Sequence, residues 1–375
     1  MAPSHLHLEP EVQLGSGLSA ADALRQISFR FAADDDQFAT IAKLRAARQL
    51  WARVAEVVGA PEAGAATIHA VTSKAMMSQR DPWVNMLRTT LAAFAAGVGG
   101  ADTVLVATFD AAIDGGLPGT AVTFSRRMAR NTQLLLLEES HLGRVVDPSG
   151  GSWFVEDLTA ALAQQAWAKF QELESRGGFV AAREHLSAQI AEVAARRADD
   201  IAHRRTALTG VNEFPNLAET ALDQTDSFPG VVRYAAAFEA LRNRSDAYLA
   251  KTGQRPQAVL LPVGPLAEHN IRTTFASNLL ASGGIEAVNP GTVDAAGVAA
   301  AVAGQAAAVV CGTDARYAEE AGDVIKAART AGVAHVYLAG PEKAVADAAD
   351  KPDEYLTMKI DAVEALSTLL TRLGA

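Results

Sequence analysis

The strongest constraint on the fold is a repeated alternation of β-like and helical segments along the 375-residue chain. Three β-like stretches come first, at 26–33, 65–73 and 102–111, and each is followed by a longer helical stretch, at 34–59, 81–100 and 121–140. Strands that are joined by helices of this length run parallel and are covered by those helices. We therefore predict an α/β fold whose first part contains three parallel strands.

A second group of strand–helix pairs begins at Pro256. Five β-like segments start near residues 258, 285, 306, 333 and 354, and they alternate with helical segments near 269–282, 293–303, 315–331, 341–349 and 361–373. Five pairs in about 120 residues are typical of a small doubly wound sheet of the flavodoxin type, where ligands bind outside the carboxyl ends of the strands. His269 follows the first of these strands, so it is expected at that edge of the sheet. Between the two groups we predict charged helices, a connecting segment at 209–233 and a further helix at 234–249.

Composition narrows the classes of function. The net charge of -10 and the pI near 5.3 argue against nucleic acid or an anionic membrane as the main partner. Cys311 is the only cysteine, which excludes a disulfide framework and a cysteine metal cluster. The first residues lack the basic start and apolar run of a signal peptide, and no apolar stretch reaches the ~18 residues that cross a bilayer. A cytoplasmic protein is expected.

Four segments resemble the methylmalonyl-CoA mutase family, in the same order along the chain. They are IAKLRAARQLW (41–51), DPWVNMLRTTLAAFAA (81–96), ARNTQLLLLEESHLGRVVDPSGGSWFVEDLT (129–159) and LTGVNEFPNL (208–217). The resemblance runs from about residue 26 to the end of the sequence. It implies the C-terminal part of a (β/α)8 barrel of the acyl-CoA mutase type at 1–205, a helical linker at 206–254, and a degenerate flavodoxin-like domain of the cobalamin-binding type at 255–375.

The family's cobalamin loop, Asp-x-His-x-x-Gly, is degraded in this chain. In catalytic members the histidine is the lower ligand of cobalt, the aspartate orients that histidine, and the glycine lets the chain pass close to the corrin. The matching residues here are Ala267, His269 and Arg272, and Val263 stands where the family has a lysine. His269 is therefore predicted to be a vestigial cofactor-binding residue, and a metal ligand only if cobalamin is bound.

The residues that contact the acyl-CoA in catalytic members are also changed. A family strand carries His-x-Gln, and this chain keeps His69 but has Val71 in place of the glutamine. A second substrate-contacting glutamine is replaced by Asp102. Valine makes no hydrogen bonds, and aspartate adds negative charge beside an anionic substrate. We therefore predict no functional catalytic residue, with His69 as a vestige.

Loss of both half-sites within an intact scaffold resembles the family's small (beta) subunit. This implies a structural, non-catalytic subunit of a heterodimeric mutase that interconverts methylmalonyl-CoA and succinyl-CoA. Adenosylcobalamin would be held by the partner, the catalytic large subunit, and acyl-CoA would be the substrate of the complex. Two alternatives stay open. The chain could be a catalytically competent mutase with His269 on cobalt, or a free-standing corrinoid-binding protein that uses only residues 256–375.

Two expectations concern packing. A full barrel needs eight strands and ~250 residues. Because three strands are expected here, either the chain is a truncated fragment or another chain supplies the missing strands. Large aromatic side chains on or beside the helices are expected to be buried and to hold the fold, namely Trp51, Trp83, Trp153 and Trp167.

Overall fold

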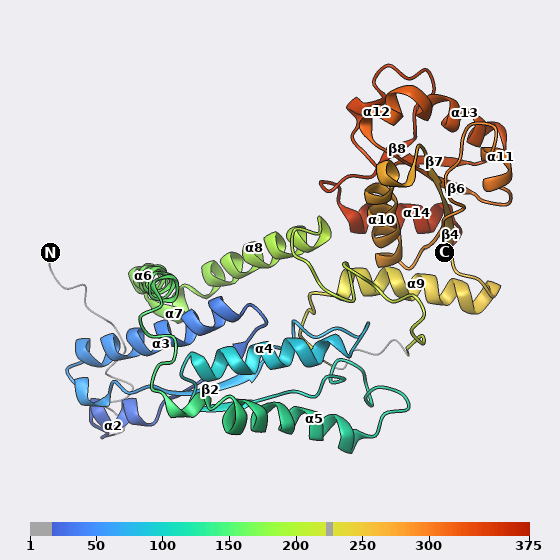
Figure 1. The fold of residues 1–375 in the computed structure, drawn as a ribbon. Coiled ribbons are helices and arrows are strands. Elements are labelled where there is room, and N and C mark those ends of the chain that lie inside the picture. Colours follow the sequence, from blue (N-terminus) through green and yellow to red (C-terminus); the bar gives the residue numbers. More distant parts are fainter. Residues whose placement is uncertain (1–16, 223–227) are drawn as a thin grey trace. The chain divides into compact units, whose positions relative to one another are not determined.

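The structure is a computed structural model that describes residues 17–222 and 228–375. It divides into two compact units, and each is described by itself (Figure 1). Unit 1 comprises residues 1–77, 82–195 and 226–233, and unit 2 comprises 78–81, 196–225 and 234–375. The first 16 residues of the predicted 1–205 region, and part of the predicted linker, lie outside the described residues.

The described residues of unit 1 form one sheet of three parallel strands in the order β1-β2-β3. The strands are β1 (Ser28–Ala33), β2 (Thr67–Thr72) and β3 (Thr103–Leu105), and the helices that follow them are α3 (Gln37–Val57), α4 (Val84–Val98) and α5 (Val122–Leu134). The predicted parallel strand–helix pairs are confirmed. The third strand is much shorter than the predicted 102–111, because the chain turns away from β2 after Leu105.

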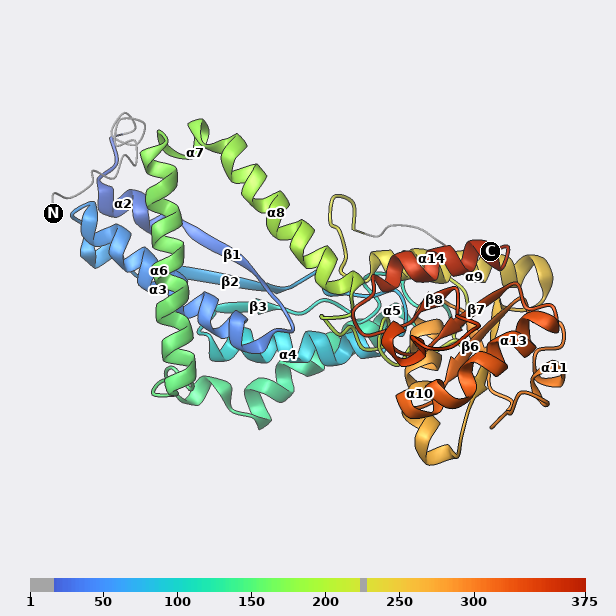
Figure 2. The same ribbon diagram turned by 90° about the horizontal axis from the view of Figure 1, so that it is seen from above.

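Further helices of unit 1 surround these pairs. They are α2 (Ala20–Arg25), η1 (Pro61–Ala63), the π-helical turn η2 (Leu135–Glu139), η3 (Leu142–Arg144), α6 (Trp153–Ser175), α7 (Gly178–Ala181) and α8 (Arg183–Ala202), of which α8 continues into unit 2. Helix α6 packs on α3 (Figure 2). Arg45 links α3 to α6 and to the loop before it, because its guanidinium pairs with Asp147 in that loop and, at 2.7 Å, with Glu156 of α6.

Unit 2 contains a sheet of five parallel strands in the order β5-β4-β6-β7-β8. The strands are β4 (Gln257–Pro262), β5 (Glu286–Val288), β6 (Ala307–Cys311), β7 (His335–Leu338) and β8 (Glu354–Tyr355). The helices are α9 (Ala236–Thr252), α10 (Leu266–Ser282), α11 (Val298–Ala301), α12 (Asp314–Arg316), α13 (Gly322–Thr330) and α14 (Ala362–Arg372), with the turns η4 (Tyr317–Ala321) and η5 (Glu342–Val345). All five predicted strands are present.

The sheet of unit 2 is buried on both faces. Strands β4 and β6 are continuous apolar runs, as expected for central strands of a parallel sheet. Their residues alternate between two clusters. Leu260 and Val309 belong to a cluster with α9, α10 and α14, whereas Leu261 and Val310 belong to a cluster with α11 and α13.

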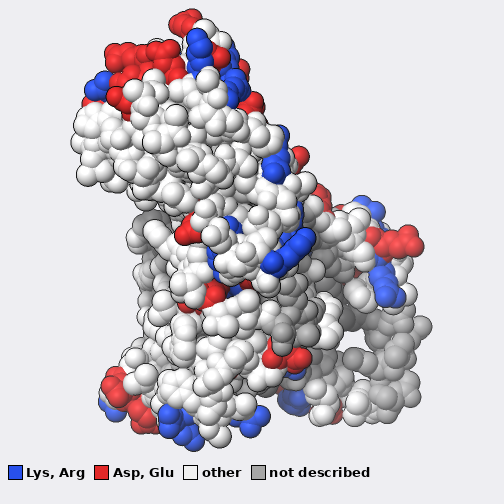
Figure 3. All heavy atoms as spheres, turned by 90° about the vertical axis from the view of Figure 1, so that its right-hand side faces the viewer, with Lys and Arg blue, Asp and Glu red and all other residues white. Residues whose placement is uncertain are grey.

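Charged side chains of both signs gather at the end of unit 2 near α12 and α13 (Figure 3).

Residues 78–81 come between β2 and α4 in the sequence but cluster with unit 2. Arg80 is 2% exposed, and its guanidinium pairs with Asp246 at 2.7 Å and donates to Asn243 at 2.6 Å, both on α9. The backbone N–H of Gln79 donates to the Glu239 carboxylate at 2.6 Å. Helix α9 therefore holds this short segment through buried, charge-assisted hydrogen bonds.

The prediction that the four tryptophans are buried anchors is wrong for two of them. Trp153 is 77% exposed and Trp83 is 47% exposed, whereas Trp51 and Trp167 are half-buried. Trp153 is the first residue of α6, and the aromatic ring against it is that of its neighbour Phe154, with ring centroids 6.2 Å apart. Its side chain therefore stands at the surface where α6 begins.

Candidate functional site

His69 lies on the open face of the three-stranded sheet. In the strand register it stands between Arg30 of β1 and Thr103 of β3, and its Nδ1 hydrogen-bonds the Thr103 hydroxyl. Alternate side chains of β1 point to opposite faces, so Phe29 and Phe31 face α3 while Arg30 is exposed on the other side. His69 is thus half-buried beside a neutral hydroxyl, and this arrangement fits a packing role as well as a catalytic one.

Val71 lines a shallow pocket of about 370 Å³ at the carboxyl ends of β1 and β2. Arg30, Ser73 and Lys74 also line it, and the Lys74 Nζ lies 5.1 Å from the centroid of the Phe228 ring. The position where catalytic members have a glutamine is therefore apolar, in a pocket with two cationic side chains. Sequence reasoning missed Arg30 and Lys74. Two features of the sequence could have identified them. Arg30 is a charged residue at an open-face position of a strand, and Lys74 is a charged residue two positions after a strand.

Asp102 has a structural role. Its carboxylate accepts a hydrogen bond from the backbone N–H of Ile68 at 2.8 Å and pairs with Arg48 at 2.9 Å. It precedes β3, so it lies at the amino end of the strand, opposite to the end where Val71 lines its pocket. The negative charge of Asp102 is therefore balanced by Arg48 within unit 1.

His269 lies in the first turn of α10, at the carboxyl edge of the five-stranded sheet. It is 3% exposed, and its Nε2 is 3.3 Å from the Thr292 hydroxyl, in the loop that follows β5. Its Nδ1 has no hydrogen-bond partner among the described residues. The described parts of the chain also contain no group of three or more His, Cys, Asp or Glu residues that could hold a metal ion.

Arg272 crosses the same edge of the sheet from α10. Its guanidinium donates to the carbonyl oxygen of Ala339 at 3.1 Å and pairs with Asp314 at 3.2 Å. Ala339 follows β7 and Asp314 lies just after β6, so one side chain bridges the ends of two strands. Arg316 forms a second ion pair across this edge, with Glu268 of α10 at 2.7 Å.

The crevice between the carboxyl ends of β4 and β6 is filled by the chain itself. Tyr317 is fully buried there, and its hydroxyl accepts from the Gly312 N–H and donates to the Ala339 carbonyl, both at 2.8 Å. Burial raises the pKa of the Tyr317 hydroxyl, which therefore stays a neutral donor. A Cβ at Gly312 would lie 2.5 Å from a methyl group of Val263, so only glycine fits between these side chains.

These residues do not fit adenosylcobalamin. From β4, the strand order runs to β5 on one side and to β6, β7 and β8 on the other. A doubly wound sheet binds its ligand where the strand order reverses in this way, which here is the β4/β6 boundary. Val263 and Tyr317 occupy that position, and Arg272 spans the strand ends beside it. His269 has a hydroxyl neighbour in Thr292, and Ala267 supplies no carboxylate to orient the imidazole.

The sequence matches the family model for methylmalonyl-CoA mutase over residues 11–252, more than half of the chain. The chain belongs to the methylmalonyl-CoA mutase family. Among the described residues, we find no helix with the length and apolar character needed to cross a membrane.

Three curated relatives within the methylmalonyl-CoA mutase family carry the words "small subunit" in their names. A Mycobacterium tuberculosis protein named "Probable methylmalonyl-CoA mutase small subunit" is 71% identical over 96% of the chain and 59% of its own length. The small subunits from Streptomyces virginiae and Propionibacterium freudenreichii subsp. shermanii are 50% and 36% identical, each over 96% of the chain, and over 58% and 57% of their own lengths. The chain thus spans a little under three-fifths of each relative.

Asp35, just after β1, is expected to make the stability of unit 1 depend on pH. Burial, together with the neighbouring Asp34, raises the pKa of Asp35 to about 7, although Arg88 lies 3.7 Å away. In the unfolded chain this carboxyl ionises near pH 4, so between about pH 4 and 7 the folded state binds more protons than the unfolded state. Stability should therefore fall as pH rises through this window. Asp35→Asn should flatten the decline in the urea midpoint between pH 5 and 8, whereas the exposed Asp157→Asn should not. If the urea midpoint fell equally with pH in the wild type, Asp35→Asn and Asp157→Asn, Asp35 would not be the source of the pH dependence.

Proposed function

We propose that the chain is the non-catalytic small subunit of a heterodimeric, adenosylcobalamin-dependent methylmalonyl-CoA mutase. The observation that carries this proposal is the boundary between the carboxyl ends of β4 and β6, which Val263 and Tyr317 occupy and beside which Arg272 spans the strand ends. Arg272 stands where catalytic members have a glycine, and it is held in place by Ala339 and Asp314. A side chain fixed in this way excludes a bulky cofactor without any change in the surrounding fold.

The partner in this proposal is the catalytic large subunit of the same enzyme. That subunit would hold adenosylcobalamin and bind the acyl-CoA, and the complex would interconvert methylmalonyl-CoA and succinyl-CoA in the cytoplasm. The names of the relatives support the partnership, since a small subunit implies a large one. Within this chain, His69 and His269 are proposed to be vestiges of the acyl-CoA and cobalamin sites. Their neutral hydroxyl partners, Thr103 and Thr292, support that reading.

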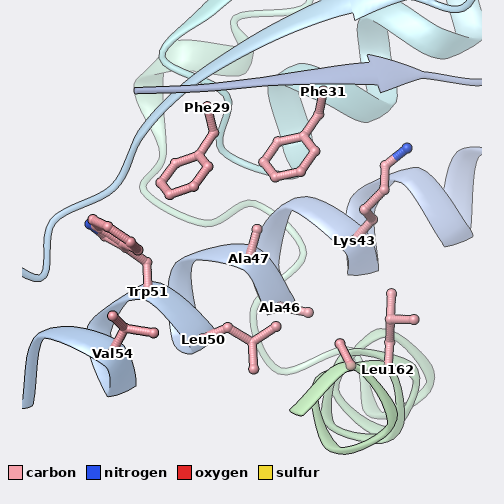
Figure 4. A pocket seen from close by; sticks show the side chains of 10 residues that line it. Phe29, Phe31, Lys43, Ala46, Ala47, Leu50, Trp51, Val54 and Leu162 are labelled. Atoms are coloured by element: carbon pink, nitrogen blue, oxygen red, sulfur yellow. The ribbon is translucent and has the colours of Figure 1, made fainter. Parts of the chain in front are cut away.

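The fold that we propose for unit 1 is the C-terminal part of a (β/α)8 barrel. Strands β1 and β3 are the edges of the described sheet, and parallel sheets rarely stop at three strands with one face open. Beside β1 lies an apolar groove of about 320 Å³ between β1, α3 and α6 (Figure 4). Phe29 and Phe31 point into it from β1, and Trp51 and Leu162 line it from the two helices. A groove of this composition beside an unpaired strand edge supports a neighbouring strand–helix pair at that place.

The domain division that we propose is a partial barrel at 1–205, a linker at 206–254 and a flavodoxin-like domain at 255–375. The strand order of unit 2, in which the second strand along the chain lies outside the first, supports the flavodoxin-like assignment. The irregular chain at 206–222 supports a linker, whereas α9 packs on the sheet of unit 2.

The function is tested by co-expression of the chain with the large subunit. We expect a complex with one copy of each chain and one adenosylcobalamin, and no change in the cobalamin absorbance when the chain alone is titrated. His69→Ala and His269→Ala should leave turnover by the complex nearly unchanged. Tight binding by the chain alone, with ligand exchange at cobalt that is lost in His269→Ala, would instead favour a catalytic chain or a corrinoid-binding protein.

A further inference from the structure

The ring of Tyr317 lies beside two buried glycines, Gly312 after β6 and Gly340 after β7. A Cβ on Gly312 would be 3.2 Å from this ring, and a Cβ on Gly340 would be 2.8 Å from it. Neither glycine has a positive φ, so the backbone conformation alone does not require glycine at these positions. The two glycines instead leave space for a flat aromatic group, and we call this space the Tyr317 slot.

The polar end of the Tyr317 slot is built from backbone groups. The Gly312 N–H donates to the Tyr317 hydroxyl, and this hydroxyl donates to the Ala339 carbonyl, both at 2.8 Å. One donor and one acceptor, from the ends of two strands, thus converge on a single oxygen atom. Sites for small molecules have this composition, because apolar walls bind the ligand and a few placed polar groups orient it.

The slot lies at the β4/β6 boundary, where a doubly wound sheet places its ligand, but its occupant comes from a helix. Tyr317 is the first residue of the π-helical turn η4, and single turns of this kind occur frequently at functional sites. The preceding residue, Arg316, pairs with Glu268 of α10 at 2.7 Å and with Glu320 of η4 at 2.9 Å. The segment that carries the ring into the slot is therefore held to α10.

We propose that Tyr317 is a tethered ligand, whose phenol group occupies a small-molecule slot of this chain and keeps it closed to free ligands. The ligand class that fits the slot is a flat, neutral aromatic molecule of phenol size, with one polar atom that both accepts and donates a hydrogen bond. A tethered group has a high effective concentration, so a dilute free ligand does not displace it. Because every residue of the slot belongs to unit 2, the slot can be tested without a partner chain.

The test removes the tethered group and supplies it as a free molecule. Tyr317→Ala in the full chain should leave a cavity of phenol shape, and the probe is 4-methylphenol, which is the tyrosine side chain without its backbone. Small aromatic molecules enter cavities made in this way. We expect saturable binding by calorimetry and a thermal midpoint that rises with probe concentration, since the probe binds the folded state. Toluene should bind about 5-fold more weakly or worse, because it leaves the two backbone groups unpaired.

Two variants are the controls. Tyr317→Phe keeps a ring in the slot, so this variant and the wild type should not bind the probe. Tyr337→Ala removes an equally buried tyrosine of β7, whose hydroxyl meets the partly exposed side chain of Arg372 at 2.6 Å. Since water can solvate Arg372 when the hydroxyl is absent, the preference for 4-methylphenol over toluene should be smaller in Tyr337→Ala than in Tyr317→Ala.

Each outcome supports or overturns the tethered ligand. Probe binding by Tyr317→Ala alone, with the stronger preference for the hydroxyl, would support it. Absence of binding to folded Tyr317→Ala, equal binding to Tyr317→Phe, or an equal preference in Tyr337→Ala would overturn it. If Tyr317→Ala does not fold, it is refolded with and without excess probe and followed by circular dichroism. Recovery of the folded chain with 4-methylphenol but not with toluene would then support the slot, and no recovery would overturn it.

Discussion

Replacing Arg242 with alanine is expected to destabilise unit 2 by about 3–5 kcal/mol, because it removes one partner of a buried ion pair. Arg242 lies on α9, is 1% exposed, and pairs with Glu219 at 3.0 Å while donating to the Asn216 carbonyl at 2.8 Å. Burial lowers the pKa of Arg242 to about 10 and raises the pKa of Glu219, so both charges are already costly to hold away from water. Without Arg242, Glu219 would keep Arg80, at 3.7 Å, as a cationic neighbour.

The measurement is urea unfolding of the full chain, followed by circular dichroism. Lys251→Ala, an exposed change on the same helix, is the control and should alter stability by less than about 0.5 kcal/mol. Arg242→Met should recover part of the loss if packing contributes, since it restores apolar volume without restoring the charge. A loss in Arg242→Ala as small as that in Lys251→Ala would show that the pair does not stabilise unit 2.

The second large effect is expected at Phe109 in unit 1. Its side chain is 2% exposed and is enclosed by Trp83 and Phe124, with ring centroids 4.8 and 6.3 Å away. Phe109→Ala should cost about 3–5 kcal/mol, because it leaves a cavity between two rings. Trp153→Ala should cost less than about 0.5 kcal/mol, since Trp153 is 77% exposed. The two variants are compared by the same unfolding experiment, and similar losses in both would contradict the packing described above.

The secondary structure and the parallel sheets could be predicted from the sequence because their signals are local. Strands β4 and β6 are largely apolar runs, and Asp36 precedes α3 as its N-cap, where its side chain accepts from the Ala39 N–H. The length of β3 could not be predicted in the same way. Residues 106–111 have the composition of a strand, but pairing with β2 extends only to Leu105.

Burial of individual side chains was the least predictable feature, because it depends on partners that are distant in sequence. Trp153 has the composition of a core residue and lies at the surface, whereas Arg80 has the composition of a surface residue and is buried on α9, more than 160 residues later. At the candidate cofactor edge, the sequence already identified Arg272 as too large for a position that needs glycine. It could not identify Tyr317, whose role depends on the close approach of Gly312 and Ala339.

The passage of residues 78–81 into unit 2 has a consequence for dissecting the molecule. The chain changes from one unit to the other at 77/78, 81/82, 195/196, 225/226 and 233/234, so no single protease cut yields two whole pieces. A gene fragment that starts at 255 would also lose α9, whose Phe238 and Leu241 share a buried cluster with Leu260 and Leu279. Such a fragment would expose that apolar surface and aggregate whatever its affinity for corrinoids. A recombinant piece intended to assay ligand binding by the five-stranded sheet should therefore begin at or before Tyr234.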